Sequence, residues 1–326
     1  MRCWITLAFA ILGIALPATG QSIRVKEVLT ELDFAKGSER KVLAGQLVKT
    51  TVKPTSDREL NAGLAFLVKV SPEKLIEKLR GGLLLSLDPN SKLHGALEGE
   101  GSGAQLAALE LSPSQVEAYS SAKAGEDMNL SQAEIEAFQA LLGDPAAQVQ
   151  GLVRNSLLAR YASYRAKGLD GIAPYARGAG REMPAAEDLR RASEAARALK
   201  KHTPAFYEVL NEYPKGKTQV TEIFHWQRYA ADGEPVLILT HAFSMAEGDA
   251  IVACQRQFYV SSSYNVEQAL VVLFPVVEGT LVVYLNRTFT EQVTGFGGGA
   301  KRSIGSRMLA SNLEDLFKRL QQEAPR

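Results

Sequence analysis

The feature that most constrains the fold of this chain is a run of five β-like segments near its C-terminal end. Short connections separate the segments, and three of these connections carry Gly233, Gly248 and Gly279. Short glycine-containing connections favour hairpins, so the sequence predicts an antiparallel meander. The predicted strands cover residues 218–229, 236–245, 251–261, 266–276 and 280–289.

Alternation along the last segment indicates a sheet with two apolar faces. Leu281, Val283 and Leu285 point to one side, whereas Val282 and Tyr284 point to the other with Asn286. A sheet that is apolar on both faces is either covered on both faces or curled around other elements.

A glycine-rich loop, residues 295–299, follows the meander and leads into a long helix that ends near residue 321. The apolar residues of this helix form one stripe, as expected for a helix that packs on the sheet. They are Ile304, Met308, Leu309, Leu313, Leu316, Phe317 and Leu320. Earlier in the chain, residues 45–52 and 60–70 read as a strand pair, and Ser71-Pro72 reads as the start of a helix over 71–79.

The region from 112 to 212 is helical. Ser112 begins one helix, Ser131 with Glu134 forms a capping box for the next, and an apolar period of helical spacing runs from 146 to 167. Residues 187–201 and the segment after Thr203 complete the helical region. The glycine-rich stretch 83–111 is expected to be a loop with one or two short strands. The stretch 170–184 is also expected to be a loop.

This order of elements resembles the START-like, or helix-grip, superfamily. Residues 281–288, 295–299 and the stretch to Leu320 are similar to the family's last strand, loop and closing helix, and residues 258–261 are similar to an earlier strand. The likeness covers residues 45–80 and 218–321. The sequences of these segments also resemble those of a group of uncharacterised exported bacterial proteins.

The resemblance implies an α+β fold in which an antiparallel meander curves around a long C-terminal helix. It predicts one such domain over 44–326, with a helical insert over about 112–212, after an N-terminal segment 21–43. Family members often hold lipids or other hydrophobic small molecules in a cavity under the helix, and some are enzymes such as cyclases. A lipid-like ligand is therefore expected. A cyclase or hydrolase-like enzyme of the same fold, and an envelope assembly protein that uses the insert as a partner surface, are alternatives.

The first 20 residues indicate export. Arg2 precedes an apolar run from Cys3 to Leu16, and small residues stand at Ala18 and Gly20, as in a cleaved secretory signal. A periplasmic or secreted protein is therefore expected, with no transmembrane segment after cleavage. Cys254 is the single cysteine that remains, and its place in an apolar strand favours a buried structural role.

Charge balance gives no case for nucleic acid as a partner. The chain has 37 basic and 36 acidic residues, so removal of Arg2 leaves the two signs equal. No protein partner is indicated. The motifs assign no catalytic residue, metal site or cofactor, because neither a G-x-S-x-G elbow nor an HExxH pattern occurs.

Seven residues are candidates for the lining of a ligand cavity. Arg256 and Arg287 interrupt apolar strands, so each either holds an anionic group of a ligand or serves as a surface or ion-paired structural residue, for instance with Glu222. His225 and His241 lie on neighbouring predicted strands. The remaining candidates are the aromatic residues Trp226, Tyr259 and Tyr284.

Three cations lie near the start of the last helix. Lys301, Arg302 and Arg307 stand where positive charge opposes the helix dipole unless an anion is close. They are either solvated surface residues or part of a site for an acidic lipid.

Overall fold

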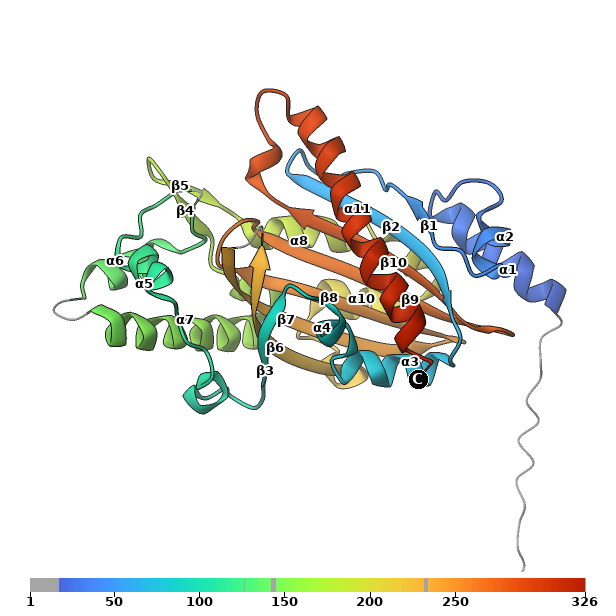
Figure 1. The fold of residues 1–326 in the computed structure, drawn as a ribbon, viewed down its shortest axis with the longest axis horizontal. Coiled ribbons are helices and arrows are strands. Elements are labelled where there is room, and N and C mark those ends of the chain that lie inside the picture. Colours follow the sequence, from blue (N-terminus) through green and yellow to red (C-terminus); the bar gives the residue numbers. More distant parts are fainter. Residues whose placement is uncertain (1–17, 126, 142–144, 232–233, 326) are drawn as a thin grey trace, which may run out of the picture.

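A large antiparallel sheet organises the computed structural model, which describes residues 18–125, 127–141, 145–231 and 234–325 (Figure 1). The described residues form eight strands in this sheet, in the order β1-β2-β10-β9-β8-β7-β6-β3. A long helix, α11 (Gly298–Glu323), follows the last strand. The α+β class, the antiparallel sheet and the C-terminal helix are therefore confirmed.

The five predicted meander strands are all present, and each pairs antiparallel with the next along the chain. Their ends differ from the predicted ends by at most three residues. Short connections leave little freedom for any other pairing, which is why this part of the sequence is so informative. The strands are β6 (Thr221–Ala231), β7 (Glu234–Glu247), β8 (Ala250–Val260), β9 (Val266–Val276) and β10 (Gly279–Phe289).

Three strands from the N-terminal third complete the sheet at its two edges. The predicted hairpin forms between β1 (Val48–Thr50) and β2 (Glu59–Val68), and β2 then pairs with β10 along its whole length. At the other edge, β3 (Ser91–Leu97) pairs with β6. Segments more than 100 residues apart in sequence therefore share one sheet, on either side of the helical region.

One face of the sheet is covered by α11, α3 (Pro72–Arg80) and α4 (Leu83–Leu87), and Figure 1 shows α11 lying across this face. Phe317 of α11 stacks on Phe66 with ring centroids 4.8 Å apart and contacts Tyr284 at 4.7 Å. Gly305 permits a close approach to β2, because a Cβ there would lie 2.8 Å from a methyl group of Leu60. The space between α11 and the sheet is thus filled by tight side-chain packing.

The other face is covered by two groups of helices. The first group, α1 (Ala18–Glu31) and α2 (Ser38–Leu43), packs on β2 and β10. The second group comes from the helical region and packs on β6 to β9. It includes α5 (Pro113–Ser120), α6 (Gln132–Gln139), α7 (Pro145–Lys167), α8 (Ala185–Glu194), α9 (Arg197–His202) and α10 (Pro204–Glu212). Both faces of the sheet are covered, as the two apolar faces of the strands required.

The sequence interpretation was wrong in three places. The stretch 83–111 contains β3, one of the short strands expected there, but also the helix α4, which was not expected. The stretch 170–184 contains a small hairpin of β4 (Tyr175–Arg177) and β5 (Arg181–Met183). Residues 187–201 form two helices instead of one. The break follows from tertiary contacts, because Ser193 at the end of α8 is bonded into the sheet whereas α9 turns toward α1.

The predicted signal peptide, residues 1–20, lies outside the described residues except for 18–20, which begin α1. Export therefore stays a prediction. Among the helices of the described residues, none is both long enough and apolar enough to cross a membrane.

Candidate functional site

A row of polar residues crosses the middle of the sheet. The strand register places Asn61, Arg287, Gln268, Arg256 and His241 opposite one another on five successive strands. Directly paired residues of antiparallel strands point to the same face. The row lies on the face away from α11, because the residues adjacent to it in sequence, such as Ala62 and Ala269, pack toward that helix. This alignment brings together three of the seven sequence candidates.

Arg256 is fully buried, with 0% of its surface exposed. Its guanidinium donates to Gln268 Oε1 at 2.9 and 3.1 Å, to Ser193 Oγ at 3.1 Å, to the Leu210 carbonyl at 2.9 Å and to the Tyr164 hydroxyl at 3.1 Å. All of these acceptors are uncharged. A buried charge is costly unless its environment compensates it, so the source of the compensation matters.

A chain of hydrogen bonds links this arginine to a carboxylate at the edge of the packed region. The Tyr164 hydroxyl lies 3.1 Å from His241 Nδ1, and His241 Nε2 lies 3.0 Å from Glu222 Oε2. Burial raises the pKa of Tyr164 to about 12 and lowers the pKa of His241 to about 4. At neutral pH the phenol is therefore protonated and the imidazole is uncharged.

These protonation states fix the direction of every bond in the chain. A neutral imidazole has one donor, and the carboxylate can only accept, so the proton is assigned to His241 Nε2. Nδ1 then accepts from Tyr164, whose oxygen accepts from Arg256. The dipoles all point from the guanidinium toward Glu222. Burial is the largest single influence on Glu222 and acts to raise its pKa, but the interactions with His241, together with those of Tyr213 and Arg165, outweigh it and the pKa is lowered.

The two candidate histidines lie on opposite faces of the sheet. His241 pairs with Phe224, and His225 pairs with Thr240. Because neighbouring residues of a strand point to opposite faces, His225 points away from the side of His241. His225 has a buried Nε2 without a protein partner, and burial lowers its pKa to about 4, with a smaller effect from His94. The two imidazoles therefore form no common site. Among the described residues, no cluster of three or more His, Cys, Asp or Glu side chains is arranged to hold a metal ion.

The three aromatic candidates are packing residues. Tyr259 lies under the guanidinium of Arg160 at 4.1 Å from the ring centroid, and Tyr284 packs against Phe317 beneath α11. Trp226 donates its indole N–H to a backbone carbonyl of the β3–α5 connection at 2.9 Å. Cys254 is buried as expected, and burial raises the pKa of its thiol to about 12, so it stays protonated and unreactive.

Arg287 occupies a different environment from Arg256, although it lies in the same row. It forms an ion pair with Glu59 and donates to the backbone carbonyl of Lys53 at 3.2 Å. The proposed structural pairing with Glu222 is therefore wrong for Arg287, and the partner is Glu59 of β2. Arg287 is the one candidate of the seven that lines a large groove.

The groove lies between α1 and the α8–α9 segment, over strands β9 and β10, and has a volume of about 1090 Å³. Its floor is a two-strand ladder in which Leu285 pairs with Leu270 and Val283 pairs with Val272. From Leu270 the floor continues to Phe274, so the apolar strip is about 14 Å long at 3.4 Å per residue. Arg287, a member of the polar row, stands at one end of the strip.

Charged side chains form the rim of the groove. Glu31 of α1 accepts hydrogen bonds from Lys201 and, at 2.5 Å, from His202 Nε2, and so joins α1 to α9. These bonds lower the pKa of Glu31. Glu247, also at the rim, accepts from the backbone N–H groups of Ala205 and Phe206 at 3.0 and 2.9 Å and holds the start of α10. The rim is thus tied together by polar contacts while the floor is apolar.

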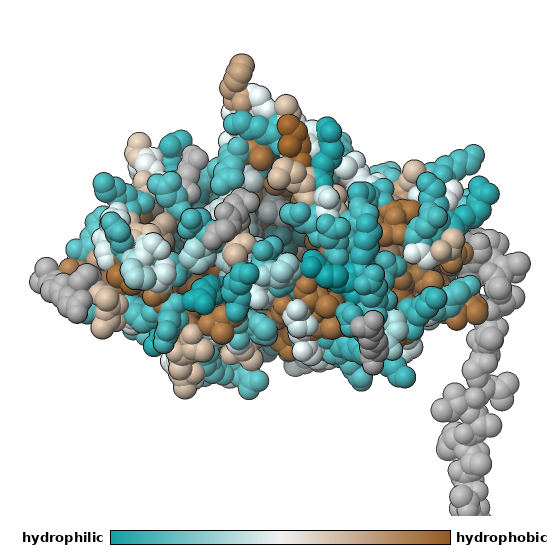
Figure 2. Space-filling view, viewed as in Figure 1, coloured by the Kyte–Doolittle hydropathy of each residue, from teal (hydrophilic) through white to brown (hydrophobic). Residues whose placement is uncertain are grey.

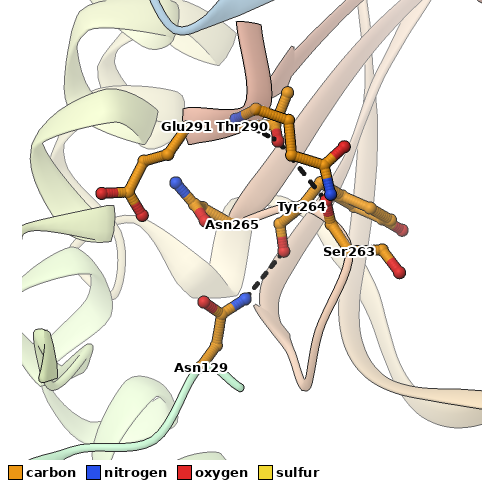
Figure 3. Close-up of a pocket in the computed structure, with 7 residues that line it drawn as sticks. Asn129, Ser263, Tyr264, Asn265, Thr290 and Glu291 are labelled. Carbon is orange, nitrogen blue, oxygen red and sulfur yellow. Dashed lines mark hydrogen bonds between the residues drawn. The ribbon is translucent and has the colours of Figure 1, made fainter. Parts of the chain in front are cut away.

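A second pocket is much smaller, at about 20 Å³, and lies where the β8–β9 and β10–α11 connections meet (Figure 3). Asn129 donates to the Tyr264 carbonyl at 2.8 Å and Thr290 to the Ser263 carbonyl at 3.4 Å. Glu291 at its edge pairs with the buried Arg177 at 2.7 Å. The volume suits a single water molecule, so this pocket is part of the packing.

Comparison with protein-family models, with curated proteins and with solved structures gives no match for this chain. Its function is therefore inferred from the geometry of the groove and of the polar row.

Sequence reasoning missed Tyr164, Gln268 and Ser193, which hold Arg256, and the apolar floor of the groove. The sequence did indicate that Arg256 needs acceptors, because a buried arginine requires hydrogen-bond partners. Their identity depends on the register of β9 and on how α7 and α8 dock, and neither is encoded in a local pattern.

Proposed function

We propose that this protein binds a hydrophobic or amphipathic small molecule in the groove between α1 and α9. The observation that carries the proposal is the groove itself, whose volume of about 1090 Å³ lies just above the range of about 300–1,000 Å³ that is usual for ligand pockets. An apolar floor beside a charged rim suits a molecule with an apolar chain and a polar end. The groove residues begin at Glu27, downstream of the predicted cleavage after Gly20.

The ligand position differs from the one expected for a helix-grip protein. We propose that the sheet and α11 form such a grip, and that in this chain the ligand lies on the opposite face. Phe66, Tyr284 and Phe317 fill the space beneath α11. By contrast, Val272, Phe274 and Leu285 are only half-buried beneath the groove. If the chain is exported as proposed, the ligand comes from the envelope or the surroundings of the cell.

Binding of a fluorescent fatty acid, parinaric acid, tests the proposal. We expect saturable binding to the wild-type protein and at least about a tenfold weaker affinity in Val272→Trp, because the indole fills the middle of the floor. Val277→Trp is the matched control, since Val277 is an exposed valine on the β9–β10 turn, outside the groove. Native mass spectrometry of both variants reports bound molecules and intact folding.

Two results would contradict the proposal. One is the lack of saturable binding to the wild-type protein together with the lack of any co-purified small molecule. The other is equal affinity of Val272→Trp and Val277→Trp, which would place the probe elsewhere on the molecule.

A further inference from the structure

The N-terminal end of α11 and the loop before it project from the body of the protein (Figure 1), and apolar residues gather at this projecting end (Figure 2). We call residues 295–308 the tip. Phe296 is completely exposed at 102%, and Ile304 and Met308 are exposed to 56% and 62%. These three residues are among the four most exposed large apolar side chains described for this protein.

The backbone of the tip presents these side chains together. Phe296 stands between Gly295 and Gly297, whose φ angles of 70° and 73° lie in the left-handed region that favours glycine. Ile304 and Met308 are four residues apart and so share one face of α11. None of the three contributes to the described core, so their apolar character is not explained by folding.

Along the sequence of the tip the charge is one-sided. Residues 292–313 contain Lys301, Arg302 and Arg307 and no acidic residue. Arg302 is used to fix the loop, because it donates to the carbonyls of Asp57 at 2.9 Å and Val293 at 3.5 Å. Lys301 and Arg307 are exposed. Cations at the start of a helix oppose its dipole, so helix stability does not explain them either.

We propose that the tip docks on a membrane surface that carries anionic headgroups. An exposed aromatic ring on a projecting loop can insert at the boundary between headgroups and acyl chains, and neighbouring cations attract anionic lipids. A second copy of this chain fits the tip less well, because contact between two tips would bring Lys301 and Arg307 against the same cations of the partner. The proposal does not depend on the groove, although docking would bring a groove for amphipathic molecules close to a source of lipid.

Flotation with lipid vesicles tests the proposal, using protein purified after export. We expect the wild-type protein to float with vesicles of phosphatidylcholine that contain about one third phosphatidylglycerol, and to bind less at about 0.5 M salt. The triple variant Phe296→Ser, Ile304→Ser, Met308→Ser should lower the bound fraction at least about fivefold. The double variant Lys301→Glu, Arg307→Glu should remove the preference for the anionic vesicles. Arg302 is left intact because it holds the loop.

Val277→Ser is the matched control, because Val277 is exposed to 68% and lies at the other end of β10. It should bind as the wild type does. All variants share the same N-terminal segment, so differences between them report on the tip. Failure of the wild type to bind anionic vesicles, or equal binding by the triple variant, would overturn the proposal. A concentration-dependent dimer that is lost in Phe296→Ser would also overturn it, by assigning the tip to self-association.

Discussion

Arg256 and Arg287 lie in the same row of the sheet, on either side of Gln268 and on the same face, yet they have different roles. Arg256 is fully buried and donates to neutral acceptors, whereas Arg287 pairs directly with Glu59 at the wall of the groove. The strands alone do not produce this difference. It arises from the helices above them.

Over Arg256 the cover is complete. Tyr164 of α7, Ser193 of α8 and the Leu210 carbonyl of α10 converge on the guanidinium. Over β10 the cover is divided between α1 and α9, which meet through Glu31, and Val272, Phe274 and Leu285 of the floor stay half-buried. The comparison shows that one row of one sheet can supply both a sealed polar network and the wall of an open groove.

Removal of the buried cation should have the largest effect on stability. We expect Arg256→Met to lower the free energy of unfolding by about 3–5 kcal/mol, because it leaves the Leu210 carbonyl without this donor and removes the other guanidinium hydrogen bonds in a dry interior. Urea denaturation measures the change. Arg190→Met is the control, since Arg190 forms a part-exposed ion pair with Asp170 and should change stability by less than about 0.5 kcal/mol. Wild-type stability of Arg256→Met would show that the network is dispensable.

Low pH should destabilise the folded protein through protonation of His241, in the buried part of the polar row. Its pKa is about 4 in the folded protein and about 6.5 when unfolded, so between these pH values the unfolded chain binds more protons at this site. The free energy of unfolding therefore falls as the pH falls through this window, by about 1.4 kcal/mol per pH unit and about 3 kcal/mol in total. Below pH 4 this contribution is fully lost.

His225 has a pKa shift of the same sign, so the two histidines share the acid sensitivity. We expect His241→Gln to reduce the slope of stability against pH between 6.5 and 4 by about half. Val277→Ser, which changes an exposed side chain and removes no titratable group, should leave the slope unchanged. Urea melts at several pH values measure all three slopes, and an unchanged slope in His241→Gln would refute the assignment of a neutral imidazole.

The smallest expected difference is in stability, between truncations of two paired valines. Val252 of β8 and Val272 of β9 are directly paired and face the same helices, but Val252 is buried under α10 whereas Val272 lies in the groove floor. Truncation to alanine should cost about 2 kcal/mol at Val252 and less than about 1 kcal/mol at Val272. Thermal or urea unfolding of both variants gives the difference. Equal costs would mean that the groove is closed in solution.

Local patterns were sufficient for most of the sheet and for the position of α11, although Ile304 and Met308 of its predicted packing stripe are exposed. The alternation of residues 281–286 assigned both faces of β10 correctly, because a strand has a period of two. Ser71 and the capping box of Ser131 and Glu134 marked helix starts that the structure has. The stretch 187–201 was predicted less well, because its break into α8 and α9 depends on contacts with two different parts of the molecule.

The candidate site was predicted only in part. Arg256 and Arg287 were singled out because charged groups in apolar strands need partners, and His241 because it lies on a strand next to that of His225. The register placed these three residues in one row. The partners themselves were not predictable. Tyr164 lies 92 residues from Arg256 in sequence, and the contact exists only because α7 docks on that face.

By itself the sequence determined the strands, their alternating faces, the antiparallel order of the meander and the long helix after it, because each depends on residues close together in the chain. Only the tertiary structure decided which helices seal the sheet and which leave a groove, and hence why Arg256 is enclosed and Arg287 lines the groove. The physical reason is that burial of a side chain is set by elements that come from distant parts of the chain. A strand pattern specifies which face needs a cover but not which element supplies it.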